Sequence, residues 1–167
     1  MSTRWRSLLL VAALGALGCE EPDLTLPRAS DVEAHYATQR RITVEMSGNV
    51  AEVTVYQPSE QLRRGGSLWA KVGPYVFLFS DATRELFVQY PGLAGVRVVT
   101  RSPSGAEVAR ALLARDALNA LTWRRALNIA GRARRDGTEK VTLLQDLVRW
   151  GEDHTTFQYA DAFVSRR

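Results

Sequence analysis

The segment ITVEMSGNVAEVTVY, residues 42–56, predicts two β-strands joined by a tight turn. In each half an apolar side chain alternates with a polar one, and a period of two is typical of a half-buried strand. The residues between the halves, Ser47-Gly48-Asn49, favour a hairpin turn. The sequence therefore predicts an antiparallel hairpin, and the rest of the fold is expected to build on it.

The stretch that follows this hairpin predicts more strands. Residues 57–66 are mostly polar and contain two glycines, so a loop is expected there. Short apolar runs separated by turn residues then predict four strands, at residues 67–72, 75–80, 85–90 and 95–101. The run at 75–80 is apolar on both faces, which predicts a buried central strand. Together these segments predict an antiparallel meander of about five or six strands.

Helix-forming residues dominate after residue 102. The predicted fold class is therefore α+β, an N-terminal antiparallel meander followed by two C-terminal helices packed on the sheet. A capping box at residues 104–107 predicts a helix that runs from there to Arg135. An unbroken helix of that length would measure about 45 Å, so a bend or break is expected near residues 119–122.

A second helix is expected at residues 139–150, with Thr138 as its N-cap and Gly151 at its end. Its apolar residues recur at helical spacing, so one face is expected to pack on the core. The tail at residues 155–164 contains three aromatic residues that partly alternate with polar ones. This tail is expected to form a last strand or an extended strap over the core.

The N-terminus combines a short basic segment with an apolar run. Arg4 and Arg6 precede an uncharged run at residues 8–17, which is far shorter than the ~20 residues of a membrane-spanning helix. This layout is typical of a secretory signal. Ala16-Leu17-Gly18-Cys19 resembles the lipobox of bacterial lipoproteins, and Cys19 is the single cysteine of the 167-residue chain.

The resemblance to bacterial lipoproteins covers residues 1–19 and implies a definite processing route. It implies a signal peptide at 1–18, cleavage between Gly18 and Cys19, and a lipid (diacylglyceryl and palmitate-type acyl chains) on Cys19. Residues 19–34 are then expected to be a lipidated N-terminus and flexible tether, and residues 35–167 a single α+β domain. The expected location is a membrane facing the periplasm, with the outer membrane favoured over the inner one.

The net charge of the chain and the spacing of its histidines and cysteine argue against several classes of function. The formal net charge is +4, and Arg4 and Arg6 contribute half of it, so no nucleic-acid partner is expected. The two histidines, His35 and His154, have no metal-ligand spacing, and no second cysteine exists. No metal and no cofactor are therefore expected.

Two clusters in the remaining sequence suggest binding or chemistry. Arginines on the predicted helix form a candidate face for an anionic ligand or a partner protein. This predicted arginine face consists of Arg124, Arg125, Arg132, Arg134 and Arg135. A hydrolase would have to pair Glu152 or Asp153 with His154 and a nucleophile such as Ser80, but adjacent residues rarely orient a histidine in that way.

These observations favour a membrane-anchored, extracytoplasmic lipoprotein that serves as a non-catalytic binding or assembly module of the cell envelope. Its expected partners are the membrane, through the lipid, and an envelope protein or anionic lipid. The alternative is a carrier of an apolar or anionic lipid-like ligand, which would need a cavity of roughly 300 Å³. A hydrolase is the least favoured hypothesis, and no catalytic residue is assigned.

Overall fold

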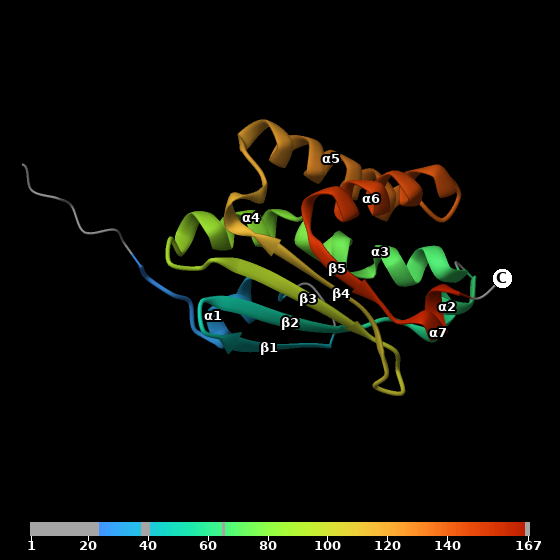
Figure 1. Ribbon diagram of the computed structural model, residues 1–167, viewed down its shortest axis with the longest axis horizontal. Helices are drawn as coiled ribbons and strands as arrows, with labels where there is room; N and C mark the ends of the chain where they lie inside the picture. Colours follow the sequence, from blue (N-terminus) through green and yellow to red (C-terminus); the bar gives the residue numbers. More distant parts are fainter. Residues whose placement is uncertain (1–23, 38–40, 65, 166–167) are drawn as a thin grey trace, which may run out of the picture.

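A five-stranded mixed sheet lies under helices in the computed structural model, which describes residues 24–37, 41–64 and 66–165 (Figure 1). The strands follow one another across the sheet in the order β1-β2-β3-β4-β5. They are β1 (Ile42–Ser47), β2 (Val50–Tyr56), β3 (Gly95–Arg101), β4 (Glu107–Ala114) and β5 (Thr156–Tyr159). Neighbouring strands are antiparallel except β2 and β3, which are parallel.

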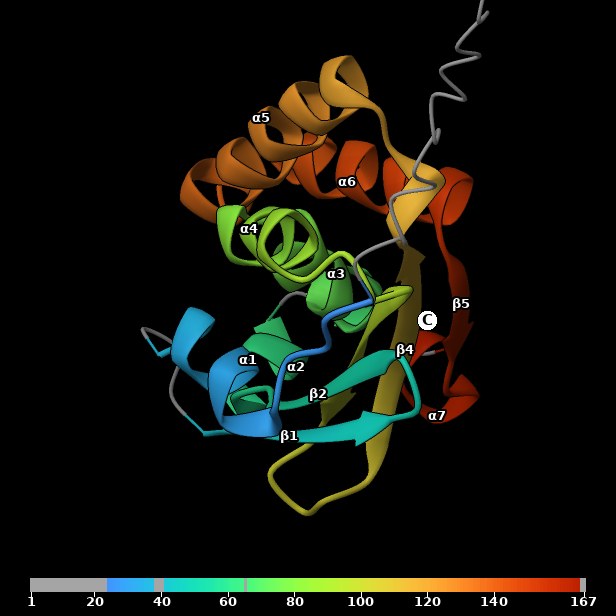
Figure 2. The same cartoon turned by 90° about the vertical axis from the view of Figure 1, so that its left-hand side faces the viewer.

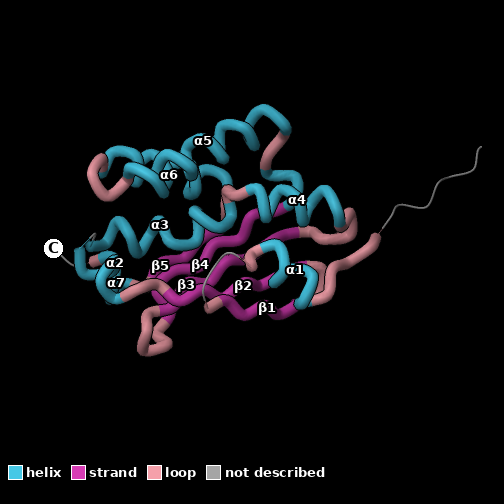
Figure 3. The backbone as a smooth tube through the Cα atoms, turned by 180° about the vertical axis from the view of Figure 1, so that it is seen from behind, coloured by secondary structure: helices cyan, strands magenta, loops and turns pink. Residues whose placement is uncertain are grey.

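The helices are α1 (Ala29–His35), α2 (Ser59–Arg64), α3 (Gly66–Leu78), α4 (Asp81–Gln89), α5 (Ala120–Asp136), α6 (Val141–His154) and α7 (Asp161–Val164), with a 3-10 turn, η1, at Arg115–Ala117. α3 contacts β3 and β4 on one side and α5 and α6 on the other, so it occupies a middle layer (Figure 2). α1 lies against β1 (Figure 3). The predicted α+β class is confirmed, while the predicted order of all strands before two helices is wrong.

The hairpin at residues 42–56 forms as predicted. β1 and β2 pair in antiparallel register with Val44 opposite Val53, and both side chains are buried. Gly48 in the turn has φ of +60°, a left-handed conformation that glycine adopts without steric cost. The strand predicted at residues 95–101 is also confirmed as β3.

The helices α3 and α4 form where the sequence predicts strands separated by turn residues. The predicted central strand, residues 75–80, coincides with the last turn of α3 and the two residues after it. Residues 85–90 lie mainly in α4. Val72, Tyr75 and Phe79 are fully buried, at the three- and four-residue spacing of one helix face. The strand prediction fails because α3 is packed between two layers, and a helix that is apolar all round has no distinctive period.

This correction also explains the parallel pair in the sheet. A chain that leaves β2 through helices α2, α3 and α4 crosses over the sheet before it enters β3. Such a crossover brings the next strand back in the same direction, whereas a two-residue turn reverses it. The sheet is therefore mixed and not the predicted antiparallel meander.

The predicted long helix from residue 104 is wrong in its first part. Residues 107–114 form β4, which pairs with β3, and Gly105, at φ of +87°, lies in the turn between the two strands. The helix begins instead after Asn119, whose side-chain oxygen accepts hydrogen bonds from the backbone N–H groups of Leu121 and Thr122. That start lies where the break was predicted, and α5 ends at Asp136 as expected.

The C-terminal part follows the prediction with two corrections. α6 has Lys140, and not Thr138, as its N-cap residue. It also continues past Gly151 to His154, so Gly151 does not end the helix. The tail contributes the predicted last strand, β5, which pairs with β4 at the edge of the sheet.

The predicted signal peptide, the lipidation site at Cys19 and the first part of the predicted tether lie outside the described residues. Residues 29–34, which were expected to belong to that tether, form most of α1. Val32 of this helix is fully buried in the core. The folded part of the chain therefore begins before residue 35.

Candidate binding groove

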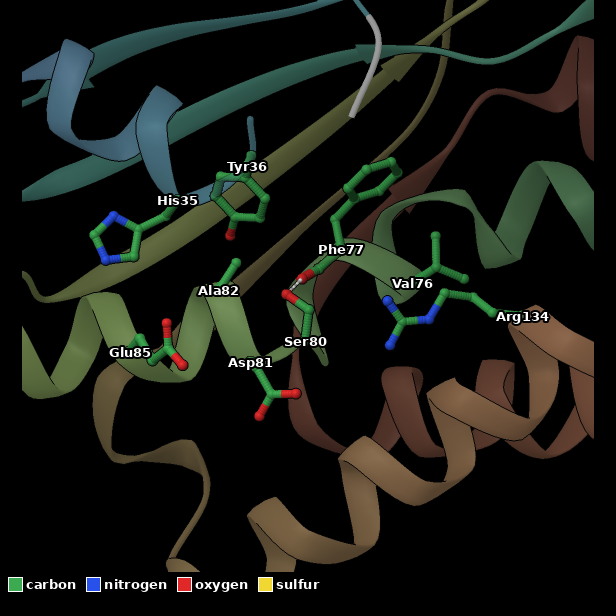
Figure 4. A pocket seen from close by; sticks show the side chains of 9 residues that line it. All are labelled: His35, Tyr36, Val76, Phe77, Ser80, Asp81, Ala82, Glu85 and Arg134. Carbon is green, nitrogen blue, oxygen red and sulfur yellow. Dashed lines mark hydrogen bonds between the residues drawn. The ribbon is translucent and has the colours of Figure 1, made fainter. Parts of the chain in front are cut away.

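A groove of about 310 Å³ opens where the ends of four helices meet (Figure 4). α1 and α3 contribute their C-terminal ends, α4 its first turns, and α5 its last turn. The lining residues are His35, Tyr36, Val76, Phe77, Ser80, Asp81, Ala82, Glu85 and Arg134. The groove is thus a surface hollow that segments distant in the sequence build together.

Hydrogen bonds fix the floor of this groove. Ser80 is the N-cap of α4: its hydroxyl accepts from the backbone N–H of Thr83 at 3.4 Å and donates to the carbonyl of Phe77 at 2.5 Å. The Tyr36 hydroxyl lies 2.5 Å from the hydroxyl oxygen of Thr83, which joins α1 to α4. Burial raises the pKa of Tyr36 above its usual value, so this phenol stays neutral. The two hydroxyl groups in the groove are therefore occupied in structural roles.

The charged side chains at the groove differ in how they are paired. Asp81 forms an ion pair with Arg84 at 2.9 Å. Within the described part of the chain, Glu85 and Arg134 form no ion pair. Figure 4 shows them reaching the groove from opposite sides, Glu85 from α4 and Arg134 from α5. The groove therefore offers a free carboxylate and a free guanidinium group.

His35 adds a ring nitrogen that can accept a hydrogen bond. Its Nδ1 lies 2.9 Å from the backbone carbonyl oxygen of Asp31. Since a carbonyl only accepts, Nδ1 carries the hydrogen, and in the neutral imidazole Nε2 is left as an acceptor. The histidine is thus held in one tautomer at the groove edge.

The arginines of the predicted face all lie on α5. At 100° per residue, Arg124, Arg125, Arg132 and Arg135 fall within about 100° of one another on its outward side, and all four are exposed. Arg125 also lies over the ring of Trp150 in α6, 4.9 Å from the ring centroid. Arg134 is turned toward α3 and α4, where it lines the groove. Four of the five arginines therefore share one exposed side of α5, and Arg134 lies apart from them at the groove.

The residues of the hydrolase hypothesis are not brought together. His154 donates through its Nδ1–H to the backbone carbonyl of Trp150, 2.8 Å away, and its ring stacks on the Trp150 ring. Glu152 accepts a hydrogen bond from the Tyr159 hydroxyl at 3.1 Å. Ser80 lies in the groove, whose lining includes none of residues 152–154. In the described residues, no group of three or more histidine, cysteine, aspartate or glutamate side chains is placed to hold a metal ion.

The Tyr159 hydroxyl belongs to a second polar cluster, between α3, α6 and β5. It lies 2.6 Å from the hydroxyl of Tyr75, whose pKa is raised to about 12 by burial. The amine of Lys71 lies 4.0 Å from Glu152 and 5.1 Å from the centroid of the Tyr159 ring. These contacts attach the edge strand β5 to α3 and α6, so we assign this cluster a structural role.

No protein-family model, curated protein or solved structure was found to match this chain. Of the groove residues, Ser80 and Arg134 are the two that the sequence suggests for chemistry or binding. The helix-capping hydrogen bonds of Ser80 do not support a catalytic role. Asp81 and Glu85 were missed because their segment was predicted to be a turn and a strand. Their spacing of four residues places both on one helix face, and an N-cap serine directly before Asp81 is the signal that points to this helix.

Proposed function

We propose that this chain is an exported lipoprotein whose folded domain is a non-catalytic binding module of the cell envelope. The lipid on Cys19 holds the domain at a membrane facing the periplasm. The groove between α1, α3, α4 and α5 binds a segment of a partner protein that carries side chains of both charge signs. The observation that carries this proposal is the pair of unpaired, opposite charges, Glu85 and Arg134, at one groove.

The anchor part of the proposal rests on the N-terminal sequence. A basic start, an apolar run of signal-peptide length and a single cysteine directly after it suit lipidation at Cys19. Two or more acyl chains at one site give a durable membrane anchor, whereas a single chain gives weak, reversible binding. No helix in the described residues is long and apolar enough to cross a bilayer.

The choice of a charged partner rests on the groove lining. A guanidinium group recognises a carboxylate through two parallel hydrogen bonds, and the Glu85 carboxylate suits a lysine or arginine. The alternative, an apolar ligand, would favour a cavity lined mainly by hydrophobic and aromatic side chains. Four ionisable side chains besides Tyr36 line this groove, namely His35, Asp81, Glu85 and Arg134. The lining therefore favours a charged protein segment over an apolar ligand.

Metabolic labelling with palmitate tests the anchor. We expect the wild-type chain to incorporate the label and to fractionate with membranes, and the Cys19→Ser chain to lose the label completely. Serine retains the size of cysteine but lacks the thiol to which the lipid is attached. Unchanged labelling of Cys19→Ser, or no labelling of the wild type, would exclude the proposed anchor.

Matched charge changes test the groove. We expect Arg134→Ala and Glu85→Gln each to weaken partner binding roughly tenfold or more, since a charged hydrogen bond contributes about 1.5–3 kcal/mol. Arg132→Ala, on the outward face of the same helix, is the control and should leave binding unchanged. Partners are crosslinked in cells, extracted with detergent and quantified by mass spectrometry for each variant. A partner lost equally in all three variants, or in none, would contradict groove binding.

A further inference from the structure

One end of the domain carries three exposed apolar side chains, and we propose that this end lies against the lipid bilayer next to the anchor. We call this end the apolar tip and define it by Leu24, Val88 and Leu121. The inference rests on the proposed lipidation of Cys19 and extends it, because it fixes which end of the domain faces the membrane. It assigns an interaction surface, with the polar–apolar boundary of the bilayer as its partner.

Three segments distant in the sequence meet at this end of the molecule, which faces the viewer in Figure 2. The backbone N–H of Gly92, just after α4, donates to the carbonyl of Thr25 at 3.0 Å, so the first described residues lie beside the end of α4. The rings of Phe87 and Trp123 are in edge contact at 6.3 Å between centroids. This ring contact joins the last turn of α4, which carries Val88, to the first turn of α5, which carries Leu121.

The tip residues are the most exposed large apolar side chains among the described residues. Val88 is 78% exposed, Leu24 71% and Leu121 66%. The next in rank is Val141 at 51%, which begins α6 and lies at the other end of the α5–α6 pair (Figure 1). Single exposed apolar residues are normal on a protein surface, but a concentration at one end indicates an interaction site.

The position of the anchor selects the bilayer as the partner of this tip. Cys19 precedes Leu24 by five residues, and a fully extended chain spans at most ~3.6 Å per residue, so the two lie within about 18 Å of each other. α5 has 17 residues and is therefore about 25 Å long. The end with Leu24 and Leu121 thus stays near the membrane surface, while Val141 is held farther along the domain.

An added cysteine tests this orientation. Lipidation consumes the Cys19 thiol, so Val88→Cys, Leu121→Cys or Val141→Cys would each provide one free thiol for a fluorescent maleimide. The lipidated proteins are reconstituted in vesicles of phosphatidylethanolamine and phosphatidylglycerol that contain lipid spin-labelled near the headgroup. All three positions are exposed, so these substitutions leave the core unchanged. Val141→Cys is the matched control at the opposite end.

We expect the spin-labelled lipid to quench the dye at positions 88 and 121 several times more strongly than at 141. Equal quenching at all three positions, or stronger quenching at 141, with one dye bound per chain, would overturn the apolar tip and leave the anchor intact. Two dyes per chain would show a free Cys19 thiol, which would overturn the proposed anchor and with it the orientation. The number of dyes and the quenching ratio therefore separate the two failures.

Discussion

Replacement of Gly151 by alanine is expected to lower the free energy of unfolding by about 2 kcal/mol. An added Cβ at this position would lie 2.5 Å from Cδ1 and Cε1 of Tyr75, which is closer than real carbon atoms approach. Tyr75 is fully buried and its hydroxyl is bonded to Tyr159, so the ring has no free space to move into. The strain must therefore be relieved by separating α6 from α3.

Gly131→Ala in α5 is the matched control, and we expect it to have the opposite sign. A Cβ at Gly131 meets nothing within 4 Å. Alanine in a helix interior is more stable than glycine by roughly 0.5–1 kcal/mol, because it loses less backbone entropy on folding. The two substitutions are chemically identical, so the difference between them isolates the contact with Tyr75.

Thermal unfolding followed by circular dichroism measures both effects. For a domain of this size, 1 kcal/mol corresponds to about 2–4 °C in Tm, so Gly151→Ala should lose about 4–8 °C and Gly131→Ala should gain slightly. A Gly151→Ala protein as stable as Gly131→Ala would contradict the packing of α6 on α3.

Gly137 and Gly151 show which features of the fold can be predicted from the local sequence. A glycine after a helical run is a good signal for a helix end, and Gly137 after α5 follows this rule. Gly151 also follows a helical run in the sequence, but its role comes from Tyr75, which lies 76 positions earlier in the chain. A contact between distant segments leaves no trace in the local pattern.

The same limit explains which elements were predicted. The hairpin at residues 42–56 and the helix α6 each have one buried and one solvated side, so their periods of two and 3.6 are visible. α3 has buried residues toward both the sheet and the outer helices, and this removes the period. Residues 104–107 match a capping box, but pairing with β3 overrides this local preference.

The candidate groove could be predicted only in fragments. Arg134 was identified by its charge, but its separation from the other arginines depends on the packing of α5 against α3 and α4. Glu85 has no signal until α4 is known to be a helix, because only then does it share a face with Asp81. A site built from the ends of four helices requires the tertiary fold before its residues can be grouped.

Replacement of Arg115 by alanine is expected to lower the free energy of unfolding by about 3 kcal/mol. Its guanidinium group donates to the carbonyl of Phe87 at 2.6 Å, to that of Leu93 at 2.7 Å and to that of Tyr90. These carbonyls lie at and just after the C-terminal end of α4, where no further turn of the helix supplies N–H donors, and among the described residues only the Tyr90 carbonyl also accepts a backbone bond, from the N–H of Leu93. Hydrogen bonds from a charged donor contribute about 1.5–3 kcal/mol each, and part of this loss is recovered by hydration because the site is half-buried.

Two further variants separate the role of this guanidinium group from the effect of a lost charge. Arg115→Lys keeps the charge but replaces a planar fork by a single ammonium group, so we expect it to recover less than half of the loss. Arg110→Ala removes an arginine whose partner is the surface carboxylate of Glu107, and exposed ion pairs contribute only about 0–1 kcal/mol. Urea unfolding of the three variants gives the comparison, and equal losses for Arg115→Ala and Arg110→Ala would contradict the capping role.

Arg115 also connects the stability of the fold to the apolar tip. The carbonyls that it holds belong to the segment that carries Val88 and joins the first described residues through Gly92. Loss of the side chain should therefore increase hydrogen exchange at residues 87–94 more than in α6, at a temperature where both proteins are folded. Because this segment forms one side of the tip, the Arg115→Ala protein should also show weaker lipid quenching of a dye at position 88 than the wild-type background does. If hydrogen exchange at residues 87–94 increased but the dye at position 88 were quenched as strongly as in the wild-type background, Val88 would contact the bilayer independently of Arg115.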